Sequence, residues 1–193
     1  VPGIKDPNKI CAPDLDVILL GIRAATYGNQ MELEPECPKC EHVNSYICDL
    51  PALLETIEYL PDDLDVRLTN DLILSLKPHT FGEQTKLLIS AFKDARVAQM
   101  ADTMEDGEGK NKIISDTYKN IIAHQNTSLT NAIVSVSAKG QVITDRAMIR
   151  EFIEKAPKQF TDKISSKLEE INQYGIDRNI PVQCEKCEHE WKT

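Results

Sequence analysis

Residues 36–42 read Glu-Cys-Pro-Lys-Cys-Glu-His, and residues 183–189 read Gln-Cys-Glu-Lys-Cys-Glu-His. The two stretches share the pattern Cys-x-Lys-Cys-Glu-His, although they lie near opposite ends of the chain. Together they supply four thiolates, the number that a closed tetrahedral zinc site requires. We therefore expect the stretches to meet in space and to share one structural Zn²⁺ per chain. The predicted ligands are Cys37, Cys40, Cys184 and Cys187.

Strand-like segments flank both cysteine pairs. Residues 31–36 alternate apolar residues with glutamates before the first pair, and residues 42–50 read as the returning strand. Residues 180–182 lead into the second pair, and residues 190–191 lead out of it. We expect a β-hairpin at each end of the chain, with the cysteines in its turn, and the two hairpins together form a split zinc ribbon.

The cysteine pairs allow two other interpretations. A redox-active pair precedes a helix in a βαβ context, whereas both pairs here lie between strand-like segments. His42 and His189 are alternative ligands, but each stands where the outgoing strand normally begins. Four cysteine ligands leave no coordination position for a substrate or water, which argues against zinc catalysis.

Helical periodicity dominates the chain between the two hairpins. Expected helices cover residues 15–27, 52–58, 80–104, 111–134, 145–156 and 160–174, and further strands cover 65–68, 72–76 and 141–143. The acidic, glycine-containing stretch at 102–109 joins two of these helices into an antiparallel hairpin. Thr80 and Glu83 match a capping box at the start of that hairpin.

The predicted fold class is α+β, with a mostly helical body inserted in a split zinc ribbon that has four cysteine ligands and is formed by two β-hairpins. Residues 1–13 are expected to be an extended arm, and residues 14–50 an N-terminal helix with the first ribbon hairpin. Residues 51–178 form the mainly helical body. Residues 179–193 form the second ribbon hairpin, in one compact unit with 14–50.

The net charge of the chain is −9, with 22 basic and 31 acidic residues. Nucleic-acid binders gain affinity by neutralising phosphates with Lys and Arg, and glutamates outnumber lysines around both cysteine pairs. The charge thus favours protein partners over nucleic acid. The longest apolar runs are too short to span a bilayer, so we expect no membrane partner.

No signature of catalysis stands out in the sequence. The phosphate-binding, dinucleotide-binding and nucleophile-elbow motifs do not occur, and His79 and His124 have no partner pattern nearby. The protein is therefore predicted not to be an enzyme. Cys11 and Cys48 lie outside the pairs, and we expect both to be buried free thiols in a reducing compartment.

Residues 16–28 read Asp-Val-Ile-Leu-Leu-Gly-Ile-Arg-Ala-Ala-Thr-Tyr-Gly and are followed by Met31 and by Cys-Pro-Lys-Cys at 37–40. This order resembles the hub family of T4-like phage baseplates, in which a helix ending in Arg-x-Ala-Ser/Thr-Tyr-Gly precedes a strand and a Cys-Pro-x-Cys pair. The likeness covers nearly the whole chain and is strongest over 14–90. It continues at residues 76–81, 142–145 and 184–189.

The resemblance implies a structural component or hub-assembly factor of a contractile phage tail. Such a protein is assembled in the host cytoplasm, resides in the tail baseplate of the virion, and binds other baseplate and hub proteins. The resemblance also allows several copies in a symmetric assembly, and it implies no catalytic residues. The alternative is a zinc-ribbon protein that acts on nucleic acid or on a polymerase, and a basic face would distinguish it.

Overall fold

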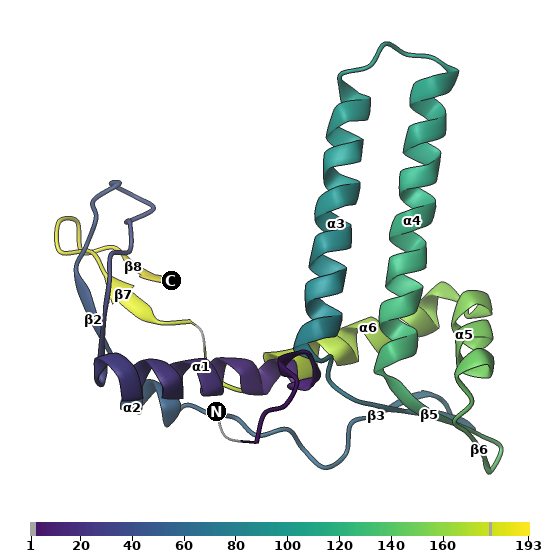
Figure 1. Ribbon diagram of the computed structural model, residues 1–193, viewed down its shortest axis with the longest axis horizontal. Coiled ribbons are helices and arrows are strands. Elements are labelled where there is room, and N and C mark those ends of the chain that lie inside the picture. Colours follow the sequence, from purple (N-terminus) through teal and green to yellow (C-terminus); the bar gives the residue numbers. More distant parts are fainter. Residues whose placement is uncertain (1–2, 178) are drawn as a thin grey trace. The chain divides into compact units, whose positions relative to one another are not determined.

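The computed structural model describes residues 3–177 and 179–193. The chain divides into two compact units. The body unit comprises the chain up to residue 12 together with residues 61–171, and the ribbon unit comprises residues 13–60 and 172–193. Helices and small antiparallel sheets alternate along the chain, so the predicted α+β class is confirmed (Figure 1).

Two separate β-hairpins and two helices make up the ribbon unit. Its elements are α1 (Ala12–Tyr27, which begins in the body unit), β1 (Gln30–Leu33), β2 (Tyr46–Asp49), α2 (Leu50–Leu54), β7 (Pro181–Gln183) and β8 (Glu190–Lys192). Strand β1 pairs antiparallel with β2, and β7 pairs antiparallel with β8. These are the two hairpins that the sequence predicted on either side of the helical body.

Helix α1 begins earlier than residue 15, where the sequence predicted its start. Pro13 occupies its second position, where a missing backbone N–H costs nothing. The helix ends as expected before Gly28, which has a φ of +92° and donates its N–H to the Ala24 carbonyl at 3.0 Å.

Gly175 links the N-terminal and C-terminal parts of the ribbon unit. It exchanges two backbone hydrogen bonds with Glu58, of 2.8 and 2.9 Å. Its φ is +107°, and a Cβ added there would lie 2.9 Å from the Pro13 carbonyl oxygen. Only glycine fits both the conformation and the space.

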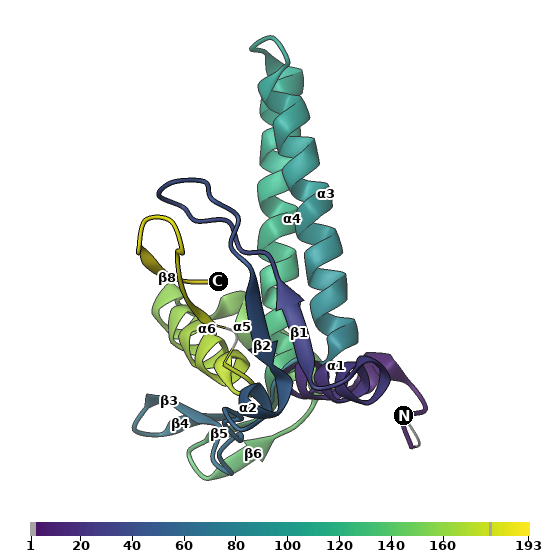
Figure 2. The ribbon, with the colours of Figure 1, turned by 90° about the vertical axis from the view of Figure 1, so that its left-hand side faces the viewer.

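The body unit contains a four-stranded antiparallel sheet in the order β3-β4-β5-β6. The elements are a short 3-10 helix (Pro7–Lys9), β3 (Asp65–Thr69), β4 (Leu72–Leu76), α3 (Phe81–Asp102), α4 (Glu108–Ala132), β5 (Ile133–Ala138), β6 (Gln141–Ile143), α5 (Arg146–Lys155) and α6 (Lys158–Gln173). Helices α3 and α4 are inserted between the neighbouring strands β4 and β5. They lie side by side as the predicted hairpin and extend away from the sheet (Figure 1, Figure 2).

Strand β5 corrects the predicted end of the second hairpin helix. Residues 133–134 were assigned to that helix, but the chain turns into a strand after Ala132. Ile133, Val134 and Val136 are β-branched and alternate in part with serines, which suits a pleated strand. Val136 is buried opposite Leu74 of β4, so pairing across the sheet overrides the helical spacing of the apolar residues.

The segment expected to be an extended arm is held against the start of α3, and its first two residues lie outside the described part of the chain. Residues Pro7–Lys9 form the 3-10 helix. The Phe81 N–H then donates to the Ile10 carbonyl at 2.8 Å, and the Ala12 N–H donates to the His79 carbonyl at 2.9 Å. The predicted capping box of Thr80 and Glu83 is present at the same helix start.

The buried core residues of the body unit come mainly from its sheet and from helices α5 and α6. Ile164, Leu168 and Ile171 of α6 are buried, and so are Ile149 and Ile153 of α5. Met148, the apolar neighbour of Ile149 in α5, is 54% exposed. No helix in the described part of the chain is long and apolar enough to cross a membrane.

Candidate metal centre

We call each of the stretches 36–42 and 183–189 a knuckle. The fold of the ribbon unit brings the four cysteines of the two knuckles together. Their sulfur atoms all lie within 4.8 Å of one another. The Sγ atoms of Cys37 and Cys187 are 3.7 Å apart, and those of Cys40 and Cys184 are 3.6 Å apart. Four sulfurs placed about 2.3 Å from a tetrahedral zinc ion would be separated by about 3.8 Å. The donor set and its spacing therefore fit a metal ion of this kind.

The two knuckles have the same backbone conformation. In each, the first cysteine donates its N–H at 2.9 Å to the carbonyl of the histidine five residues later. Glu41 and Glu188, which follow the second cysteines, have φ values of +57° and +58°. The first cysteine of each knuckle also lies beside the second cysteine of the other. The duplicated sequence thus folds into two equivalent halves of one site.

Hydrogen bonding and burial shift the acidities of the clustered thiols in opposite directions. A backbone hydrogen bond from His42 lowers the pKa of Cys40, but burial and the other knuckle thiols outweigh it and raise the pKa to about 12. Burial raises the pKa of Cys184, but backbone hydrogen bonds from Cys187 and Lys186, with side-chain bonds from the cluster, lower it to about 6. Four neighbouring thiols resist joint ionisation, and a bound cation would supply the charge that allows it.

Burial separates the four clustered thiols into an inner and an outer pair. Cys37 and Cys184 are buried, whereas Cys40 and Cys187 are partly exposed. Neither His42 nor His189 belongs to the cluster found among the described residues. The His189 ring instead stacks on Trp191, with centroids 6.2 Å apart and planes 9° from parallel.

Asn44 is a site residue that the sequence did not reveal. Its side chain is buried, and its Nδ2 donates to the carbonyls of Pro35 and His42 at 3.2 and 3.0 Å. Its Oδ1 accepts the backbone N–H of Glu185 at 2.9 Å. Asn44 thereby ties the first knuckle to the second. The bonded partner is 141 residues away, so no local pattern marks the position.

Comparison with known proteins identifies the family of the chain. A family model described as T4 bacteriophage base plate protein matches residues 3–193. The chain belongs to this family. No curated protein and no solved structure matches the chain.

This match confirms the predicted resemblance to a T4-like baseplate family. Membership in a base plate family implies a location in the phage tail and contact with other tail proteins. The four cysteines could hold a metal ion, and their role as ligands stays a prediction.

The remaining cysteines of this base plate protein differ in their surroundings. Cys48 in β2 is buried, and burial, followed by the charge of Asp49, raises the pKa of its thiol. Cys11 is only half-buried, so the expectation that it lies in the core is wrong. Its place beside Thr80, where residues 10–12 cross the start of α3, leaves one side accessible.

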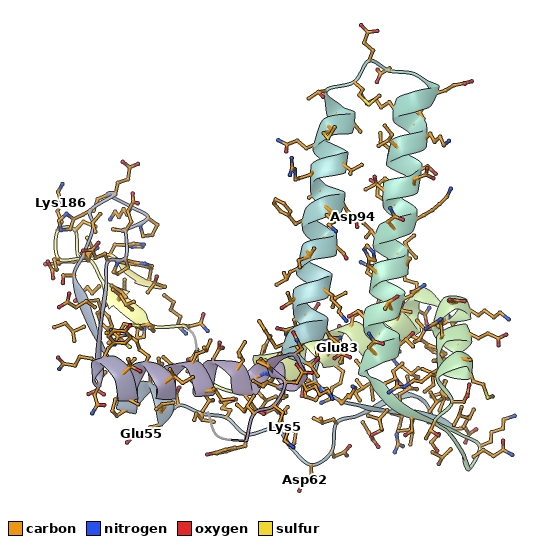
Figure 3. All side chains as sticks on the ribbon, viewed as in Figure 1. Lys5, Glu55, Asp62, Glu83, Asp94 and Lys186 are labelled. Carbon is orange, nitrogen blue, oxygen red and sulfur yellow. The ribbon has the colours of Figure 1, made fainter. Side chains whose placement is uncertain are left out.

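The two histidines outside the knuckles have partners distant in sequence. His79 is buried, and its Nε2 lies 3.0 Å from the Ser128 hydroxyl. The Nδ1 of His124 lies 3.2 Å from Asp94, which projects between α3 and α4 (Figure 3). Both pairs join segments of the body unit that the sequence alone does not place together.

Replacing Glu41 or Glu188 with glycine is expected to stabilise the ribbon unit. A residue with a Cβ is strained at positive φ, and relief of this strain is partly offset by the larger unfolded-state entropy of glycine. We expect a gain on the order of 0.5 kcal/mol per site. Thermal or chemical denaturation of the metal-loaded protein measures it. The control is Glu41→Val, which should lower stability because a β-branched residue tolerates this conformation poorly.

Proposed function

We propose that the protein is a structural component or assembly factor of a contractile phage tail baseplate, acting in its hub region by binding other baseplate proteins. The match of one base plate family model to residues 3–193 carries this proposal. In this role the protein is made and assembled in the host cytoplasm and ends in the tail baseplate. The hub region is proposed because residues 14–90 resemble the hub family of T4-like phage baseplates.

The knuckle cysteines support a structural zinc ion, one per chain. Cys37, Cys40, Cys184 and Cys187 would fill all four positions of a tetrahedral ion and leave none for a substrate. The ion would act as a clamp between residues 14–50 and residues 179–193 and make them one domain. The mainly helical body, residues 51–178, would then be held at both of its ends.

The proposed role needs no catalytic group. A closed thiolate site provides stability and offers no water for activation. The two histidine pairs of the body unit are internal contacts between its segments. The protein therefore serves as a scaffold whose working surfaces contact other proteins.

Recovery of complexes from infected cells tests the baseplate assignment. A tagged copy of the full chain should co-purify with baseplate proteins, identified by mass spectrometry after mild cross-linking. The same tag on an unrelated cytosolic protein of similar size is the control. Recovery of the soluble, folded chain without any baseplate protein, through the whole assembly period, would overturn the proposal.

The nucleic-acid alternative predicts a different measurement. The net charge of −9 and the glutamates around the knuckles predict weak binding to DNA and RNA. Filter binding across a salt titration should therefore show no tight complex even at low salt. Tight binding that weakens steeply with salt would favour the alternative function.

A further inference from the structure

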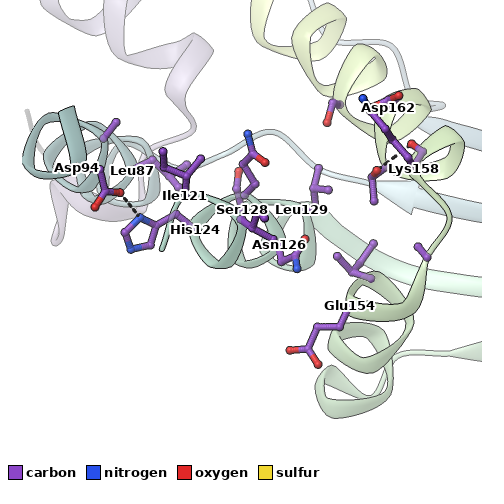
Figure 4. A pocket seen from close by; sticks show the side chains of 17 residues that line it. Leu87, Asp94, Ile121, His124, Asn126, Ser128, Leu129, Glu154, Lys158 and Asp162 are labelled. Atoms are coloured by element: carbon purple, nitrogen blue, oxygen red, sulfur yellow. Dashed lines mark hydrogen bonds and ion pairs between the residues drawn. The ribbon is translucent and has the colours of Figure 1, made fainter. Parts of the chain in front are cut away.

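A groove in the body unit lies between the helical hairpin and helices α5 and α6. Its volume is about 830 Å³, and Leu87, Ile121, Ile122 and Leu129 are among its apolar lining residues (Figure 4). Helix α3 lines the groove with residues 87, 91 and 94, which recur at helical spacing on one side of the helix.

The groove also carries negative charge. Glu154 of α5 and Asp162 of α6 line it together with Asp94, which is paired with His124. Lys158 also lines the groove, so three carboxylates stand against one lysine and the paired histidine. An occupant with both apolar and basic side chains would suit this surface.

The opposite side of α3 has that composition. This side carries residues 89, 93, 96 and 100, which have the same spacing as the groove-lining residues but stand two positions later in the sequence. Two positions correspond to a rotation of about 200° around the helix axis, so these residues face away from the groove. We name Ile89, Phe92, Lys93, Arg96 and Met100 the outer stripe. Phe92 and Met100 are 64% and 66% exposed, and the Arg96 guanidinium lies 6.0 Å from the Phe92 ring centroid. Among the described residues, Lys93 and Arg96 form no ion pair.

The outer stripe and the groove occupy corresponding levels of the hairpin. The stripe covers residues 89–100 of α3, and the groove contacts residues 87–94 of the same helix. A second copy could therefore place its stripe in the groove with little shift along the hairpin axis. A contact between two different surfaces repeats head to tail from copy to copy, and it closes into a ring where the rotation between neighbouring copies divides a full turn.

Charge complementarity favours a copy of this chain as the occupant. With a net charge of −9, two copies repel each other in general. The basic residues of the stripe offer a local exception, and the carboxylates of the groove complement them. Ile89, Phe92 and Met100 of the stripe are each at least half exposed, and a contiguous exposed apolar patch is typical of an interaction surface.

We propose that the outer stripe of α3 in one copy packs into the groove between the hairpin and α5–α6 of a second copy, in a head-to-tail contact that closes into a ring. This contact goes beyond the proposed baseplate role and depends neither on that role nor on the metal. It predicts two non-equivalent surfaces on each copy, both required.

The mass of the full, zinc-loaded chain in solution tests the proposal. By light scattering at tens of micromolar, the wild type should form a discrete oligomer that weakens as salt is raised. Phe92→Glu in the stripe and Ile122→Glu in the groove should each give a monomer. Val142→Glu is the matched control, because Val142 is 67% exposed on β6 outside both surfaces, and this variant should keep the wild-type mass. Helix content by circular dichroism shows that each variant is folded.

Mixing the two monomeric variants distinguishes this contact from a symmetric one. The Phe92→Glu variant retains an intact groove, and the Ile122→Glu variant retains an intact stripe. Their mixture should form a dimer with one copy of each and grow no further. A monomeric wild type, folded variants that keep the oligomer, or a mixture that stays monomeric would overturn the proposal.

Discussion

The Cys184→Ser variant is expected to release its metal ion and to unfold the ribbon unit. Structural zinc contributes on the order of 10 kcal/mol of apparent binding free energy, and that energy stabilises only the folded state. Cys184 is buried and lies against Cys40 across the two knuckles, so serine removes a ligand at the junction itself. We expect far less than one zinc per chain by elemental mass spectrometry, together with a large fall in the melting temperature.

The matched control for this variant is Cys48→Ser. Cys48 is also a buried thiol of the ribbon unit but lies outside the cluster, so its replacement should leave the zinc content unchanged. The body unit has its own core of buried isoleucines and leucines and should keep its helical signal in both variants. Wild-type protein purified under reducing conditions with little zinc would contradict the metal assignment.

The Asn44→Ala variant is expected to bind zinc 10- to 100-fold more weakly, an order-of-magnitude range typical for lost partners of metal ligands. Alanine removes three hydrogen bonds and leaves the N–H of Glu185 without its bonded oxygen. The knuckles then lose their direct link, although all four cysteines remain. Competition with a chromophoric chelator measures the affinity.

Two further variants sharpen the test of Asn44. Ser45→Ala changes the exposed neighbour and should leave the affinity unchanged. Asn44→Asp keeps an oxygen for the Glu185 N–H but loses the two donated bonds and adds negative charge near the thiolates. It should therefore weaken zinc binding as well. Wild-type affinity in the Asn44→Ala variant would show that the cysteines alone position the two knuckles.

The helix boundaries show which features of the fold a short stretch of sequence can predict. The capping box of Thr80 and Glu83 could be predicted because the two residues are only three apart in the sequence. Strand β5 was missed because its apolar residues also match a helical spacing. Its pairing with β4 is made across the entire helical hairpin, and no window of sequence contains both strands.

The duplicated Cys-x-Lys-Cys-Glu-His stretches determined the ligand candidates, strand alternation around them determined the two hairpins, and helical periodicity determined the helical body between them. These are local properties, because ligand type, spacing and strand alternation are all contained within a few residues. Tertiary structure alone decided that Asn44 bridges the knuckles, that His124 meets Asp94, and that a groove lies opposite the outer stripe of α3. Each of these depends on side chains brought together from segments far apart in the chain, where packing and hydrogen-bond geometry select the partners.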